Sequence, residues 1–89
     1  MFRMYNGQRK EIELICDNDV MDAIIDKFGK DVKVLANDMK SFRVIANTAV
    51  GSVFYSWVFG FGGKVKIKSP EEVKEQYKQM VLNSVDSLD

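Results

Sequence analysis

The sequence predicts an α+β domain with the ferredoxin-like βαββαβ order, in which a four-stranded antiparallel or mixed sheet carries two helices on one face. Three observations support this fold class. Four segments alternate apolar and polar residues, as strands with one buried side do. Two segments with apolar residues at helical spacing separate these strands. The run from Ser69 to Glu72 reads Ser-Pro-Glu-Glu, which is typical of a helix start and predicts a further, C-terminal helix.

The first strand and helix are expected after a short linker. The segment from Met1 to Gln8 has no periodicity, so the single domain is expected to span residues 9–89. Arg9 to Cys16 alternates and predicts a strand. The run from Asp17 to Asp19 offers side-chain oxygens as N-caps to a helix, and Gly29 is expected to end that helix because glycine tolerates a left-handed backbone.

A hairpin is predicted next. The segment from Asp31 to Ala36 alternates, Asn37 and Asp38 form a turn signal, and a longer alternating strand follows as far as Val50. The residues expected to face inward from these two strands are Val32, Val34, Ala36, Phe42, Val44, Ala46, Thr48 and Val50.

The second half of the domain predicts a helix, a turn, a strand and the last helix. The second helix begins at Gly51 and Ser52, and a glycine-rich turn from Gly60 to Gly63 ends it. Lys64 to Lys68 alternates and predicts the fourth strand. The second helix is expected to make its apolar contacts through Val53, Phe54, Trp57 and Val58, and the last helix through Val73, Tyr77, Met80, Val81, Val85 and Leu88.

In the expected sheet the first and third strands are central and parallel, while the second and fourth strands form the edges. The positions of the lysines agree with this assignment. Lys33 falls on the second strand, and Lys64, Lys66 and Lys68 fall on the fourth. Charged side chains on edge strands discourage one sheet from pairing with another.

Composition excludes several classes of partner. The 89 residues include 13 basic and 13 acidic side chains. This balance argues against autonomous nucleic-acid binding and against an anionic membrane surface as partner. No apolar stretch approaches the roughly 18 residues of a membrane span, and the one cysteine, Cys16, has no disulfide partner within the chain. We therefore expect a cytoplasmic protein.

No catalytic, metal-binding or cofactor-binding site is predicted. The chain has no histidine, so the commonest general base and metal ligand is missing. Cys16 is expected to be an inert core thiol, and Asp17, Asp19 and Asp22 are interpreted as helix-capping groups. The glycines from Gly60 to Gly63 follow a helix and precede a strand, which is the opposite polarity to a phosphate-binding loop.

Two surfaces are candidates for binding a partner. The outer face of the sheet is expected to carry Ile15 and Ile45 on its central strands, with Leu35 and Arg43 beside them. Scattered surface hydrophobes, or coverage by the last helix, would equally explain this pattern. The second surface combines exposed aromatic and basic residues, which are able to stack on and attract single-stranded nucleic acid. Its residues are Tyr55, Phe59, Lys64, Lys66 and Lys68.

The chain also resembles a known family. The residues that carry the resemblance include Ser52, Phe54, the run from Trp57 to Gly62, Val65 to Ile67, and Pro70 to Val73; an upstream part runs from Val20 to Val32. Together they are similar to the C-terminal extension, or WCX, domain of WYL-domain transcriptional regulators, over nearly the whole chain. In that family a helix-turn-helix reads DNA and a WYL barrel senses a ligand. Neither part has a counterpart here, so we expect a piece of a longer bacterial regulator.

The resemblance implies a non-enzymatic role in oligomerisation or effector coupling. A homodimer or homo-oligomer is the expected partner, a small-molecule or nucleotide effector is possible in principle, and DNA is expected to be contacted only through the helix-turn-helix. Two alternatives stay open at this point. One is a stand-alone module that binds a small molecule, and the other is a single-stranded nucleic-acid-binding surface.

Overall fold

The computed structural model describes residues 7–29 and 32–86. Residues 1–6 of the predicted linker, Asp31 and Leu88 lie outside the described residues. The elements follow one another as β1 (Gln8–Asp17), the 3₁₀ helix η2 (Asn18–Val20), α1 (Met21–Phe28), β2 (Lys33–Ala36), β3 (Ser41–Val50), α2 (Ser52–Phe59), β4 (Val65–Ser69) and α3 (Glu71–Asp86). The predicted class is confirmed: this is an α+β chain with the four predicted strands.

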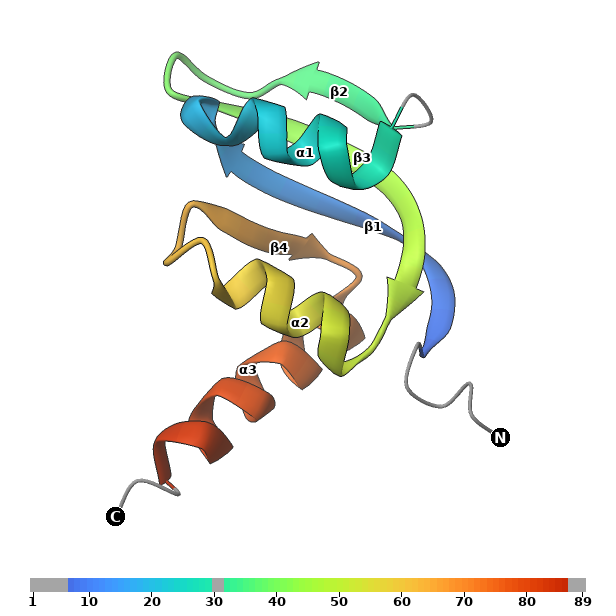
Figure 1. Cartoon of the computed structure of the whole chain (residues 1–89), viewed down its shortest axis with the longest axis vertical. Coiled ribbons are helices and arrows are strands. Elements are labelled where there is room, and N and C mark those ends of the chain that lie inside the picture. The colour runs from blue at the N-terminus through green and yellow to red at the C-terminus, as the bar shows by residue number, and fades with distance from the viewer. Residues whose placement is uncertain (1–6, 30–31, 87–89) are drawn as a thin grey trace.

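The four strands form one sheet with the order β2-β3-β1-β4 (Figure 1). As expected, β1 and β3 are central and β2 and β4 are the edges. The prediction that β1 and β3 run parallel is wrong, because every neighbouring pair is antiparallel. The reason lies in the connections. β1 and β2 run in the same direction, because η2 and α1 connect them. The tight β2–β3 hairpin then reverses the chain, so β3 runs against both β2 and β1.

Helices α1 and α2 cover the same face of the sheet (Figure 1). The central strands turn alternate side chains toward this face, as strands with one buried side do. The helices add Ile24 from α1 together with Phe54 and Val58 from α2. The sheet residues of the core are Ile12, Leu14, Cys16, Phe42, Val44, Ala46, Val50, Val65 and Ile67.

Two inward predictions for β2 are wrong. Val34 is 39% exposed and Ala36 is also exposed, whereas Val32 packs against the core. The strand has only four residues and pairs on one side only, with β3, so its side chains lie at the edge of the sheet, where fewer neighbours cover them.

The buried face of α2 is rotated relative to the prediction. Tyr55 is buried and Val53 is exposed, because α2 packs against α3 as well as against the sheet. The Tyr55 ring lies 5.8 Å from the ring of Tyr77 on α3, and its hydroxyl donates to Gln76 Oε1 at 3.0 Å. Trp57 is half-buried and packs against the core, as predicted, and Phe61 packs beside it.

The helix ends agree with the prediction at Gly29 and differ at the aspartates. Gly29 caps α1 with a φ of 71°, a backbone angle that favours glycine. By contrast, no side chain caps the starts of η2 or α1. The Asp19 carboxylate instead accepts from Lys64 Nζ at 2.7 Å, and Asn18 Nδ2 donates to the Met39 carbonyl at 3.0 Å. These side chains tie neighbouring turns together.

Candidate functional site

The first predicted surface lies on the outer face of the sheet, where apolar and charged side chains alternate. Across the central pair, Ile45 lies opposite Glu13, and Ile15 lies opposite Arg43. The two isoleucines therefore occupy one diagonal. On the other diagonal Arg43 Nη1 donates to Glu13 Oε2 at 2.8 Å. This ion pair divides the apolar spot, so Ile15 and Ile45 do not form a continuous patch.

Leu35 extends this face toward the edge of the sheet. It lies opposite Arg43 on β2, and its side chain is half-buried like those of Ile15 and Ile45. Helix α3 makes its main sheet contacts with β4, beyond the edge of the central strands. The structure thus brings the four predicted residues onto one face, but with a charged pair between the apolar ones.

The second predicted surface is not assembled as expected. Tyr55, predicted to be exposed, is only 6% exposed, because its ring packs against Tyr77. The three lysines, Lys64, Lys66 and Lys68, are exposed, as predicted, and Lys64 also pairs with Asp19. Phe59 alone fulfils the prediction of an exposed ring, with 58% of its surface accessible.

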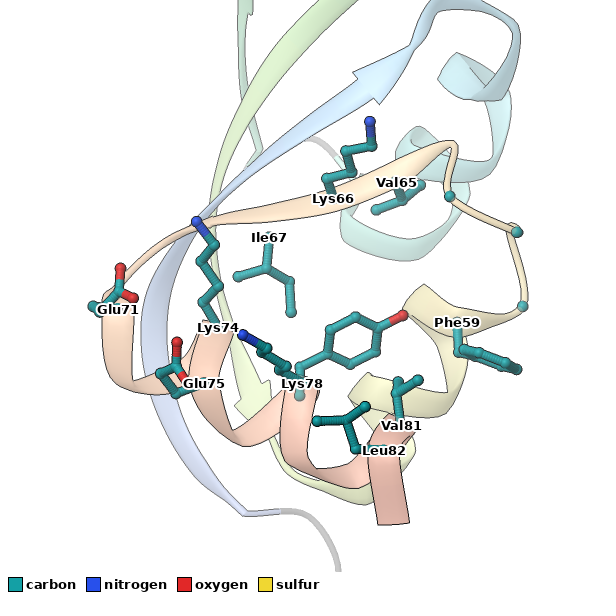
Figure 2. Close-up of a pocket in the computed structure, with 14 residues that line it drawn as sticks. Phe59, Val65, Lys66, Ile67, Glu71, Lys74, Glu75, Lys78, Val81 and Leu82 are labelled. Atoms are coloured by element: carbon teal, nitrogen blue, oxygen red, sulfur yellow. The ribbon is translucent and has the colours of Figure 1, made fainter. Parts of the chain in front are cut away.

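A hollow lies between β4, the α2–β4 turn and α3 (Figure 2). It is an open groove of about 880 Å³. In Figure 2, Val65 and Ile67 point from β4 toward α3, while Lys66 points away from it. The far wall consists of α3 residues, including Val81 and Leu82, and Phe59 closes the end next to the turn. Lysine and glutamate side chains rim the groove: Lys66, Lys74, Lys78, Glu71 and Glu75.

Helix α3 carries apolar side chains on two faces, one against the core and one exposed, and the sequence predicted only the first. Val73, Tyr77 and Met80 pack on the core, as expected. The face toward the groove begins with charged residues and ends with Val81 and Leu82, of which Leu82 is 47% exposed. Val85, one turn further along α3, is 56% exposed and does not line the groove. Val85 was expected to be buried, and Leu82 was not singled out. The signal was present: apolar residues at the end of α3 occupy more than half of the helix circumference, which is too wide for one buried stripe.

The α2–β4 turn holds Phe59 at the end of the groove. Gly60, Phe61 and Gly62 continue the hydrogen bonding of α2 in tightening turns, and the Lys64 amide then donates to the Phe61 carbonyl at 3.2 Å. Gly62 and Gly63 have φ values of 62° and 96°. The predicted turn is confirmed, and its backbone requires glycine at these two positions.

Burial raises the pKa of some ionisable side chains in the described part of the chain, including Cys16 and Tyr77. Cys16 is fully buried, and desolvation together with the nearby Asp17 raises the pKa of its thiol to about 12. The thiol is therefore protonated at neutral pH and unreactive. Desolvation also raises the pKa of Tyr77 beside the groove. Among the described residues, no cluster of acidic or thiol side chains is arranged to hold a metal ion.

In the part of the chain that the structure describes, no helix is long and apolar enough to cross a membrane.

Comparison with known proteins gives one finding. The family model of the WCX domain matches residues 11–83, from the first strand through most of α3. No curated protein and no solved structure matches the chain. The matched segment contains most of β1, the other three strands of the sheet and both sides of the groove. The resemblance noted in the sequence is thereby confirmed: the chain belongs to the WCX domain family, whose members are associated with WYL-type transcription regulators.

Proposed function

We propose that this WCX domain is a non-enzymatic assembly module of a bacterial WYL-type transcription regulator that works in the cytoplasm. The arrangement that we assign to it is ferredoxin-like. The βαββαβ order, the strand order β2-β3-β1-β4 and the antiparallel pairing of all neighbours support that assignment. The family membership supports the association with a regulator.

The observation that carries the assembly role is an exposed apolar patch formed by Phe59, Leu82 and Val85. Their side chains are 58%, 47% and 56% exposed. Phe59 and Leu82 both line the groove, and Val85 follows Leu82 by three residues on α3. Contiguous exposed apolar side chains on a small domain mark an interaction surface. This patch is a better interface than the outer face of the sheet, where the Arg43–Glu13 pair separates Ile15 from Ile45.

Self-association through this patch provides a mechanism. Two regulator subunits joined at their WCX domains hold their DNA-reading helices at a fixed separation, and half-site spacing on DNA depends on that separation. An effector that alters the packing of the patch changes the separation. DNA itself is contacted by the helix-turn-helix of such a regulator and not by this domain.

Sedimentation velocity with the Val85→Glu variant tests the proposal. The wild-type domain is expected to show a dimer that dissociates on dilution, and the variant is expected to be a monomer at the same concentrations, since a buried unpaired carboxylate is costly. Val85 is exposed within one chain, so the variant is expected to retain its thermal stability as a monomer.

Asn83→Glu is the matched control. It adds the same charge on an exposed α3 position two residues away, on the opposite side of the helix. The control is expected to dimerise like the wild type. A wild-type domain that remains monomeric at millimolar concentration, or a control that dissociates as completely as Val85→Glu, contradicts the proposal.

The groove also favours a second function, the binding of a small-molecule effector. Its volume of about 880 Å³ lies in the range of ligand sites, and it has apolar walls with charged rims. Thermal-shift measurements against metabolite and nucleotide pools test this function, because a ligand that binds only the folded state raises the melting temperature.

The burial of Tyr55 argues against the third function, binding to single-stranded nucleic acid. An oligonucleotide titration at low salt that shows no binding would exclude it.

A further inference from the structure

The groove between β4 and α3 carries two lysines on one row of the helix. Lys74 and Lys78 line the groove, are exposed, and form no ion pair in the described part of the chain. Val81 follows Lys78 by three residues, so with about 100° of rotation per residue the three side chains lie within about 60° of one another around the helix axis. This row of α3 therefore begins with positive charge and ends with an apolar side chain.

Two glutamates, Glu71 and Glu75, also line the groove and form no ion pair among the described residues. Their position on α3 differs from that of the lysines. Val73 is 1% exposed and marks the side of the helix that faces the core. Around the helix axis, Lys74 and Lys78 lie roughly 100° and 140° from Val73, whereas both glutamates lie roughly 160° from it. The lysines thus stand nearer to the floor of the groove, and the glutamates form its outer rim.

The other end of the groove is apolar and open to solvent. Phe59 and Leu82 line it and are 58% and 47% exposed. In Figure 2 the Lys74 side chain lies at the opposite end of the groove from Phe59. Leu82 follows Lys74 by eight residues, a rise of about 12 Å along α3, which is roughly the length of a ten-carbon chain. The groove therefore separates a cationic end from an apolar end by the length of a short lipid chain.

From this arrangement we propose that the groove binds a single-chain amphipathic carboxylate, such as a fatty acid, and that this ligand regulates self-association. The carboxylate accepts from the ammonium groups of Lys74 and Lys78, and charge-assisted bonds of this kind are short and strong. The chain lies along Val81 toward Phe59 and Leu82, where its contact removes apolar surface from water. The glutamates at the outer rim repel further negative charge, so the ligand carries one carboxylate.

The regulatory part of this proposal rests on the proposed function. Phe59 and Leu82 belong both to the exposed patch assigned to self-association and to the groove. A chain that lies against them covers apolar surface that a second subunit needs. Coupling between two binding events is reciprocal. The acid therefore dissociates the dimer, and the dimer binds the acid less tightly than the monomer does.

The binding test uses decanoate, below the concentration at which it forms micelles, titrated into the full chain with the Val85→Glu substitution. This variant is expected to be a monomer, and Val85 does not line the groove. Calorimetry and amide NMR are expected to show saturable binding of one decanoate, with shifts at Phe59 and Leu82. Decylamine is expected to bind about threefold to tenfold more weakly, from the size of exposed ion pairs.

Three charge variants in the same Val85→Glu background locate the carboxylate. Lys74→Gln is expected to weaken decanoate about twofold to fivefold and to leave the binding of decanol unchanged. Lys68→Gln is the matched control, because Lys68 is exposed on β4 but does not line the groove. It is expected to bind like the Val85→Glu parent. Glu75→Gln removes a charge of the opposite sign and is expected to bind decanoate as tightly as the parent or slightly more tightly.

Three results overturn the site: shifts that do not saturate or that centre on Ile15 and Ile45, equal losses in Lys74→Gln and Lys68→Gln, or decylamine binding at least as tightly as decanoate with a loss in Glu75→Gln. The last result would assign the rim to a cation.

Sedimentation velocity of the wild-type chain tests the regulation separately. Saturating decanoate is expected to convert the dimer to a monomer, and a dimer that persists overturns the regulatory part while the site stands. A wild-type chain that is monomeric without decanoate refutes self-association, and the regulatory part with it. Binding in the Val85→Glu background still decides the site in that case.

Discussion

At the scale of single residues, the position of each aromatic ring on α2 decides whether it stabilises the fold or remains available to a partner. Tyr55 and Phe59 are four residues apart, but one is 6% and the other 58% exposed. Tyr55→Ala is expected to lower the free energy of unfolding by about 3 kcal/mol or more, as for other large buried rings. Phe59→Ala is expected to change it by about 0.5 kcal/mol or less. Urea denaturation measures both, and equal losses would contradict the assignment of Tyr55 to the core.

Burial of Cys16 predicts the alkaline behaviour of the domain. The pKa of the thiol rises from 9.0 to about 12 on folding, so above pH 9 the unfolded chain releases a proton that the folded chain keeps. Stability is therefore complete below pH 9 and falls as the pH rises toward 12. The loss from this one group at pH 10 is about 1.4 kcal/mol.

Cys16→Ala isolates this contribution. The variant is less stable overall, but its stability is expected to fall less than that of the wild type between pH 8 and pH 10. Urea denaturation at both pH values gives the comparison, and the tyrosines contribute alike to both proteins. Identical pH slopes for the two proteins would show that the thiol does not titrate as the structure indicates.

At the scale of elements, the α2–β4 turn needs glycine because of its backbone conformation and not because a side chain would clash. An added Cβ at Gly63 meets no atom within 4 Å, but the φ of 96° is one that other residues rarely adopt. Gly63→Ala is therefore expected to lower the free energy of unfolding by about 1–2 kcal/mol.

Gly60 supplies the comparison within the same turn. Its φ of −62° suits any residue, so Gly60→Ala is expected to be neutral or to stabilise by about 0.5 kcal/mol. Thermal or urea unfolding measures the two variants, and a Gly60→Ala loss as large as that of Gly63→Ala would refute the conformational explanation.

Local pattern predicted the elements well, and tertiary packing explains where it failed. The alternation from Arg9 to Cys16 and the signals at Gly29 and Pro70 depend on nearby residues, so these elements were predictable. Whether Val53 or Tyr55 faces the interior depends on α3, which lies some twenty residues further along the chain. The direction of β3 relative to β1, by contrast, follows from the β2–β3 hairpin, which the sequence did predict.

The candidate site was the least predictable part for the same reason. Its walls come from β4, the turn and α3, so the groove depends on how α3 packs against β4. The sequence did predict Phe59 and Lys66 as surface residues. It did not indicate that Leu82 and Val85 join Phe59, because a residue pattern does not reveal which side of α3 meets the core.

At the scale of the whole molecule, the chain is a small WCX domain that satisfies the buried polar side chains of its described residues and exposes several large apolar ones. Among the described side chains, no buried nitrogen or oxygen lacks a hydrogen-bond partner. The apolar side chains of Phe59, Leu82 and Val85, by contrast, remain exposed to solvent. A domain of this size buries only about 60–65% of its unfolded surface, so burial of such a patch against a second subunit stabilises both.

Isotope-filtered NMR on a mixture of ¹³C-labelled and unlabelled domain tests self-association through this patch most directly, because it reports which methyl groups contact the other subunit. Intermolecular NOEs are expected from the methyls of Leu82 and Val85, and they are expected to disappear in Val85→Glu and to persist in Asn83→Glu. Intermolecular NOEs from Ile15 and Ile45 on the outer face of the sheet, or none at any concentration, would contradict it.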